Sequence, residues 1–152
     1  MATIQLPSDF KDFLKLLNAH KVEYLLIGGY AVGYHGYPRA TADMDIWVAT
    51  NSQNARKLVA VLKEFGFDVP ELSEELFLKQ DQIIRMGLPP VRIEIATTIS
   101  GVEFESCYAE RVVDILDDVE VNLINLKHLI INKRASGRFR DLDDLENLPQ
   151  EV

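Results

Sequence analysis

Residues 24–48 read YLLIGGYAVGYHGYPRATADMDIWV, and this stretch carries most of the information about the fold. Four apolar residues followed by two glycines predict a short buried strand that ends in a turn. Residues 42–48 begin with alternating polar and apolar side chains, which predicts a second strand. The thirteen residues 30–42 between the second glycine and Asp43 leave room for a short helix over 30–35 and a return loop. We therefore expect the two strands to lie side by side.

Two carboxylates stand out in the second of these strands. Asp43 and Asp45 are two positions apart, so both should project from one face, while Met44 and Ile46 point into the core. Carboxylates this close repel each other unless a cation lies between them. Mg²⁺ (or Mn²⁺) suits such a pair, since Mg²⁺ commonly binds one or two carboxylates together with substrate phosphates. Two solvated acids on an edge strand are the alternative interpretation.

The glycines Gly28 and Gly29 follow the first strand and open a helix. Glycines at such a place let backbone N–H groups come close to a phosphate, and a helix N-terminus attracts anions. A plain turn is the alternative. A phosphate-binding turn beside a metal-binding pair of aspartates is the layout that nucleotidyl transfer requires.

The rest of the chain contributes alternating helices and strands. Ser8 is expected to cap the first helix, Asn51 or Ser52 the next, and Gly66 to end that helix. Residues 70–80 give no clear pattern. The expected elements are helices over 9–20, 52–65, 104–109, 125–135 and 139–147, a hairpin of 82–86 and 91–97 around 87–90, and a strand over 119–123. Because a hairpin is present among interleaved elements, we predict an α+β (mixed α/β) fold, a mixed β-sheet packed with helices in a single domain over 1–152.

Composition excludes several classes of protein. The 152 residues carry 16 Lys and Arg against 24 Asp and Glu, a net charge of −8, which argues against bulk DNA binding. The single cysteine, Cys107, excludes an internal disulfide and a cysteine-based zinc site. No segment approaches the roughly 20 apolar residues of a membrane span, and the first residues lack the pattern of a signal peptide. A cytoplasmic protein without a membrane partner is therefore expected.

One basic window interrupts this acidic sequence. Lys133, Arg134, Arg138 and Arg140 supply four of the sixteen basic residues within eight positions. The window could bind a triphosphate, an acceptor RNA or a partner protein. Its alternative is a solvated helix face paired with the neighbouring aspartates.

The combined sequence motifs resemble the nucleotidyltransferase superfamily, which includes DNA polymerase beta and the small bacterial minimal nucleotidyltransferases. They are similar to a short bacterial branch related to the nucleotidyltransferases of toxin–antitoxin and abortive-infection systems. The resemblance touches most of the chain. The similar segments are LIGGYAV at 26–32, HGYPRAT at 35–41, DMDI at 43–46, VRIEI at 91–95, ISGV at 99–102, NKRASGR at 132–138, and DL at 141–142 and 144–145.

This resemblance implies metal-dependent transfer of a nucleoside monophosphate from an NTP to an acceptor hydroxyl, with release of pyrophosphate. The family uses three carboxylates as metal-binding and catalytic residues, and Glu94 matches the third position, where Asp is more usual. Residues 93 and 95 would face the core, which leaves Glu94 and Arg92 together on the opposite face. A surface glutamate paired with Arg92 or another basic residue is the alternative interpretation of Glu94. By position, the resemblance also favours Lys133 as a residue that faces the active site.

Two residues of the loop before the aspartates are further candidates for substrate binding. Arg39 could steady a phosphate, and the hydroxyl of Thr41 could help to fix the metal or substrate. Loop solvation and hydrogen bonding at the strand start are the alternatives. Cys107, His35 and Trp47 are expected to pack against apolar or loop atoms, although Trp47 could instead stack on a base.

A second function remains open on the sequence. The protein could be a non-catalytic nucleotide-binding protein, or a toxin–antitoxin partner, that retains the fold. Its support is the small size, because larger members resemble this domain joined to a helical acceptor-binding domain, and a small helical partner protein could take that place. A metal phosphohydrolase is disfavoured, since no His-Asp ligand pattern occurs. The acceptor itself, whether RNA, protein or small molecule, is left open, as is the nucleobase.

Overall fold

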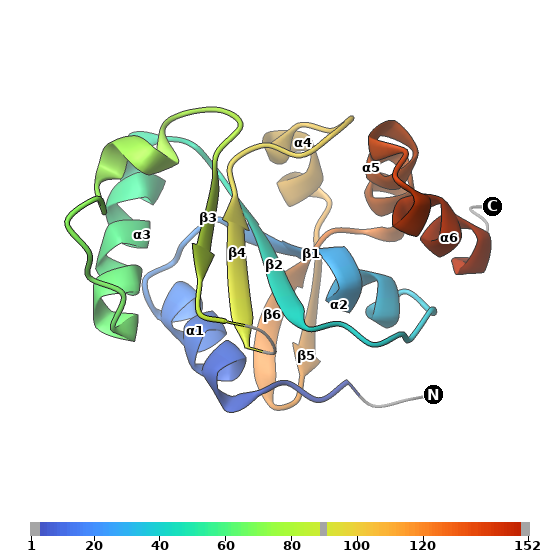
Figure 1. Cartoon of the computed structure of the whole chain (residues 1–152), viewed down its shortest axis with the longest axis horizontal. Helices are drawn as coiled ribbons and strands as arrows, with labels where there is room; N and C mark the ends of the chain where they lie inside the picture. The colour runs from blue at the N-terminus through green and yellow to red at the C-terminus, as the bar shows by residue number, and fades with distance from the viewer. Residues whose placement is uncertain (1–3, 89–90, 150–152) are drawn as a thin grey trace.

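A mixed six-stranded sheet in the order β3-β4-β2-β1-β6-β5 forms the centre of the computed structural model, which describes residues 4–88 and 91–149 (Figure 1). The strands are β1 (Tyr24–Ile27), β2 (Asp43–Val48), β3 (Ile83–Met86), β4 (Arg92–Ala96), β5 (Val112–Leu116) and β6 (Val119–Leu123). The helices are α1 (Ser8–Ala19), α2 (Gly28–Tyr34), α3 (Ser52–Phe65), α4 (Phe104–Ala109), α5 (Leu126–Ser136) and α6 (Phe139–Asn147), with a 3₁₀ helix η1 (Glu74–Phe77). The predicted α+β fold is confirmed.

Strand β2 pairs with β1 on one side and with β4 on the other. As predicted, β1 and β2 lie side by side, and they are antiparallel. Strand β2 also pairs in parallel with β4, which places Asp43 opposite Arg92 and Asp45 opposite Glu94. The predicted hairpin is present, with β3 antiparallel to β4, although residues 89–90 of its expected turn lie outside the described residues.

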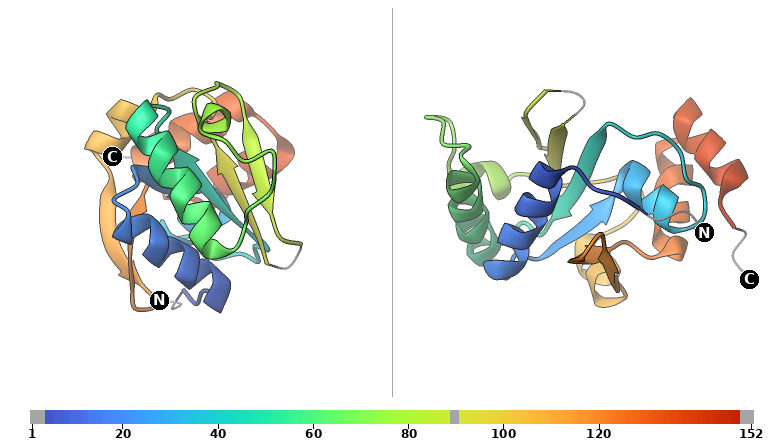
Figure 2. Two further views of the ribbon diagram at one scale, coloured as in Figure 1. Left: turned by 90° about the vertical axis from the view of Figure 1, so that its left-hand side faces the viewer. Right: turned by 90° about the horizontal axis from the view of Figure 1, so that it is seen from below.

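Two apolar clusters hold the sheet between layers of helices. Helices α1 and α3 lie side by side over one face (Figure 2, left), where Met44 and Ile46 are fully buried as predicted. On the other face Trp47 packs edge-to-face on Phe104 of α4. That second cluster also includes residues of α2 and α5. Alternation along β2 therefore sends its apolar residues into both cores and leaves the carboxylates at the strand start partly exposed.

Several predicted helix ends differ in detail. Ser8 is not a cap, since α1 already begins at Ser8 and Pro7 occupies the position before it with no side-chain bond. Proline is suited to a helix start because it lacks the N–H that would stay unpaired there. Asn51 does cap α3 through the N–H of Asn54, and Gly66 ends that helix in the left-handed conformation. Helix α2 begins at Gly28, two residues before the predicted start.

The sequence interpretation missed strand β5. It pairs with β6 across Asp117 and Asp118, whose φ angles of 49° and 70° are positive. Two-residue hairpin turns with positive φ favour Asn, Asp and Gly, so the Asp-Asp pair was an available signal. The unassigned segment 70–80 contains η1, which buries Phe77. Among the described residues, no helix combines the length and the apolar character needed to cross a membrane.

Candidate active site

The two glycines after β1 pack directly against the start of β2. A Cβ atom on Gly28, which has a φ of 66°, would overlap the carboxylate of Asp45. A Cβ on Gly29 would lie only 2.5 Å from the hydroxyl of Thr41. The Thr41 hydroxyl in turn donates a hydrogen bond of 3.2 Å to the backbone carbonyl of Asp43. Glycine is thus required here because the turn and the aspartate strand touch.

All eight residues that the sequence analysis proposed for the site line one cleft of about 880 Å³. The cleft is open along the ends of β1, β2 and β4 and is bordered by α5 and α6. These eight residues are Gly28, Gly29, Arg39, Thr41, Asp43, Asp45, Glu94 and Lys133. The structure therefore brings together residues that are up to 105 positions apart in the chain.

The carboxylates of this cleft are crowded. Burial, together with the negative charges of Glu94 and Asp43, raises the pKa of Asp45 to about 7. Among the residues described by the structure, the Oδ1 atom of Asp43 is buried without a hydrogen-bond partner. A buried acceptor without a donor, beside a carboxyl that resists ionisation, is an environment that a cation would stabilise. Asp43 and Asp45 thus fit a hard divalent cation such as Mg²⁺.

Two arginines lie among these acids, and we call the group of Asp43, Asp45, Glu94, Arg85 and Arg92 the strand cluster. The Nη2 atom of Arg92 is 2.8 Å from Asp43 Oδ2 and 3.4 Å from Glu94 Oε1. Arg85 of β3 also contacts Glu94, with its Nε atom 3.1 Å from Oε1. Within residues 4–88 and 91–149, no three His, Cys, Asp or Glu side chains already converge as metal ligands. Glu94, the expected third carboxylate, is thus held in salt bridges with Arg85 and Arg92.

A second charged group, the helix cluster, contains Arg39, Lys133, Asp141 and Asp144. Arg39 forms a two-pronged pair with the fully buried Asp144, with Nε–Oδ1 2.8 Å and Nη2–Oδ2 3.0 Å. Lys133, 5% exposed, lies 2.8 Å from Asp141 Oδ1 and 3.1 Å from Asp144 Oδ2. The cluster joins the loop before β2 to α5 and α6, which lie together in Figure 1.

The helix cluster leaves one cationic group turned toward the Gly-Gly turn. A Cβ on Gly29 would be 3.4 Å from Arg39 Nη1, the nitrogen that Asp144 does not bind. Lys133 is close enough for its charge to oppose the rise in the pKa of Asp45. The basic window is in part paired with aspartates, since Arg138 Nε also contacts Asp141 at 2.9 Å. Arg138 and Arg140 border the cleft.

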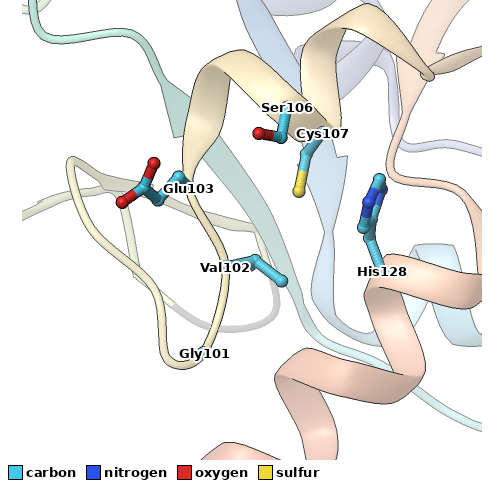
Figure 3. A pocket seen from close by; sticks show the side chains of 6 residues that line it. All are labelled: Gly101, Val102, Glu103, Ser106, Cys107 and His128. Atoms are coloured by element: carbon cyan, nitrogen blue, oxygen red, sulfur yellow. The ribbon is translucent and has the colours of Figure 1, made fainter.

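A second hollow of about 510 Å³ lies between the 101–103 loop, α4 and α5. Figure 3 shows Cys107 of α4 and His128 of α5 on its wall. Burial raises the pKa of the Cys107 thiol to about 11, so the thiol stays protonated at neutral pH and is a poor nucleophile. This agrees with the prediction that Cys107 is a packed apolar residue.

Two other aromatic predictions can be judged from the structure. Trp47 is 2% exposed and belongs to the core, which leaves no face free to stack on a base. His35 shares a 2.8 Å hydrogen bond between its Nε2 atom and the carbonyl of Ile124, and so supports the loop as expected. Burial lowers the pKa of His35, so it is held in the neutral form.

Sequence reasoning did not single out Arg85 or the buried role of Asp144. Arg85 was recognisable from the hairpin, because strand alternation places it on the face of Glu94. For Asp144 the signal was its i, i+3 spacing from Asp141 on a helix, which puts both on one face. Aspartates are seldom fully buried, however, and a solvent-exposed face was the more ordinary expectation.

A mixed sheet in which a strand bearing two aspartates lies between a Gly-Gly turn and a strand with a third carboxylate is the arrangement of the nucleotidyltransferase class. The family described as nucleotidyltransferase of unknown function (DUF6036) matches residues 4–149, and the chain belongs to that family. Among curated proteins, none matches the sequence significantly.

Proposed function

We propose that the protein is a metal-dependent nucleotidyltransferase that moves a nucleoside monophosphate from an NTP to an acceptor hydroxyl. The main support is the crowding of Asp43, Asp45 and Glu94 in one cleft, where the pKa of Asp45 is raised to about 7. Carboxylates in this state gain from a divalent cation and from the phosphates that accompany it. Membership of a nucleotidyltransferase family supports the same assignment.

Each of the eight candidate residues of the cleft has a role in this proposal. Asp43 and Asp45 would hold Mg²⁺ or Mn²⁺, and Glu94 would serve as a third ligand or accept the proton of the acceptor hydroxyl. The backbone at Gly28 and Gly29 would approach the triphosphate. Arg39 would turn Nη1, which Asp144 does not bind and which donates a long hydrogen bond of 3.5 Å to the carbonyl of Ala40, toward a phosphate oxygen. Lys133, which is paired with Asp141, would add positive charge to the cleft, and Thr41 would fix the start of β2 through its hydrogen bond to the carbonyl of Asp43.

The chemistry is a single displacement at phosphorus. The acceptor oxygen forms a bond to the α-phosphorus as the bond to the bridging oxygen breaks, and pyrophosphate leaves in line. A bound divalent cation supplies charge neutralisation on the phosphate oxygens. The protein contributes the position of the phosphates and a partly dry, polar cleft in which electrostatic contacts are stronger than in water.

The test is incubation of the purified chain with each labelled NTP, a cell extract and Mg²⁺ or Mn²⁺. We expect one class of acceptor (RNA, protein or small molecule) to become labelled. The Asp43→Asn/Asp45→Asn double variant should lose this labelling by at least about a hundredfold. Asp9→Asn/Asp12→Asn is the matched control, because it removes the same charge from exposed positions on α1. Equal labelling by the double variant and the control would overturn the proposal.

The alternative is a non-catalytic nucleotide-binding or toxin–antitoxin partner protein with the same fold. The observation in its favour is that Arg85 and Arg92 already neutralise much of the strand cluster. Calorimetry with MgATP tests the alternative beside the labelling assay. Absence of binding would favour a partner protein, and binding without any labelled acceptor would favour a non-catalytic nucleotide-binding protein. Relation to toxin–antitoxin systems is part of the proposal and predicts a neighbouring gene for a small helical protein.

A further inference from the structure

We propose that Arg92 is an internal counter-ion that competes with the divalent cation for Asp43, and that it thereby sets the metal affinity of the cleft. This inference rests on the proposed function, because it takes Asp43 as a metal ligand. It concerns a residue that neither the sequence motifs nor the family description assigns to the site.

Register brings the two groups together. Arg92 is the cross-strand partner of Asp43 in the parallel pair of β2 and β4. Its Nη2 atom lies 2.8 Å from Asp43 Oδ2 and 3.4 Å from Glu94 Oε1. One guanidinium nitrogen therefore bridges two carboxylates, and a cation that used Asp43 would have to share or replace this contact.

The contact is incomplete on both sides. In the part of the chain that the structure describes, Asp43 Oδ1 and Arg92 Nε are both buried and both lack a hydrogen-bond partner. Arg39 shows what a complete pair looks like, since it binds both oxygens of Asp144 through Nε and Nη2. Unpaired buried polar atoms weaken a structure. The Arg92–Asp43 pair is thus poorly suited to a permanent structural role and well suited to exchange.

The charges and the exposure also fit exchange. The two arginines of the strand cluster oppose three carboxylates and contact two of them, Asp43 and Glu94, so much of the negative charge is already compensated within the protein. Each positive charge nearby weakens the attraction for a second cation. The Arg92 side chain is 32% exposed, so its guanidinium can move toward solvent without disturbing the apolar residues of β4.

Mn²⁺ binding to the full chain tests the inference, with free Mn²⁺ measured by electron paramagnetic resonance. We expect Arg92→Gln to bind Mn²⁺ about tenfold more tightly than the wild type, a size typical of residues that contact metal ligands. Arg85→Gln is the matched control, because it removes the same charge but contacts Glu94 rather than Asp43, and its gain should be smaller. Arg92→Lys keeps the positive charge on a shorter side chain, and its affinity for Mn²⁺ should stay within about threefold of that of the wild type.

The outcomes separate this inference from the proposed function. If wild type binds Mn²⁺ through Asp43, as loss of binding in Asp43→Asn would show, but Arg92→Gln binds no more tightly, the competition is overturned and the metal site stands. If neither the wild type nor any arginine variant binds Mn²⁺, the metal site and the competition both fail. Should Arg92→Gln misfold by circular dichroism, an affinity of Arg92→Lys for Mn²⁺ more than about threefold above that of the wild type would count against the inference, because lysine keeps the positive charge.

Discussion

The strand cluster and the helix cluster are built from the same chemical groups, yet their carboxylates respond in opposite ways. In the strand cluster, burial and neighbouring charges raise the pKa of Asp45 to about 7. In the helix cluster, burial alone would raise the pKa of Asp141, but hydrogen bonds from Lys133, Ser136 and Arg138 outweigh it and lower the pKa to about 2. The acids of the strand cluster are only partly paired, since Asp43 Oδ1 is buried without a hydrogen-bond partner among the residues that the structure describes, whereas Asp141 accepts from three side chains.

This difference indicates that the helix cluster stabilises the fold and that the strand cluster is suited to binding an external group. Saturated pairs between elements hold those elements together and position the side chains that take part in them. Under-satisfied carboxylates destabilise the protein on their own, and they persist where an external group completes them. Three substitutions test this distinction.

The largest effect is expected for Asp144→Asn in the helix cluster. Asp144 is fully buried and pairs with both Arg39 and Lys133, so the variant leaves two cations without their shared anion. Removal of one partner from a buried pair destabilises a protein by about 3–5 kcal/mol. Urea unfolding measures this change. The control is Asp143→Asn, at an exposed position on the same helix, which should change the free energy of unfolding by less than about 0.5 kcal/mol. Similar losses in both variants would contradict a structural role for the helix cluster.

A smaller loss is expected for Gly28→Ala at the Gly-Gly turn. The new Cβ would meet Asp45 in a backbone conformation that only glycine adopts easily, so we expect about 3 kcal/mol of destabilisation. Gly66→Ala shares the positive φ but has open space around its Cβ position, and it should cost only about 1 kcal/mol. Thermal unfolding of both variants gives the comparison. An equal loss would show that the contact with Asp45 contributes nothing.

The smallest effect is a gain in stability for Asp45→Asn without metal. Because the pKa of Asp45 is higher in the folded state, the folded protein binds more protons between about pH 4 and pH 7. Wild-type stability should therefore fall as the pH rises through this window, whereas the amide is neutral throughout. We expect Asp45→Asn to be more stable by about 2 kcal/mol at pH 8 and equal to wild type near pH 4. Urea unfolding at both pH values checks this, with exposed Asp68→Asn as the control; a loss of stability at pH 8 would contradict it.

The part of the fold that sequence predicts well is the part governed by local pattern. Alternation placed Met44 and Ile46 in the core, and the hairpin of β3 and β4 followed from two apolar runs around a proline-containing turn. The parallel pairing of β2 with β4 was not predictable in this way, because it depends on how a long connection folds back rather than on neighbouring residues. That pairing alone sets Arg92 against Asp43.

In the candidate site, too, local patterns predicted some features, and others depend on tertiary packing. Its eight residues were proposed from short motifs together with family resemblance, and they share one cleft. A pair of Glu94 with Arg92 or another basic residue was the alternative to a catalytic role, and the structure contains this pair. The contact of Arg85 with Glu94 was not foreseen, since it depends on the register of β3 against β4. The Asp144 pair with Arg39 spans 105 residues, so its formation is a consequence of tertiary packing that no local pattern reports.

That span has a consequence for synthesis of the protein on the ribosome. The aspartates of β2 emerge early, but the anion that fixes Arg39 belongs to α6, Phe139–Asn147. A nascent chain that has exposed β2 but not yet α6 carries the carboxylates without the positioned arginine beside them. The cleft is therefore completed late in translation, when nearly all of the described chain has left the ribosome.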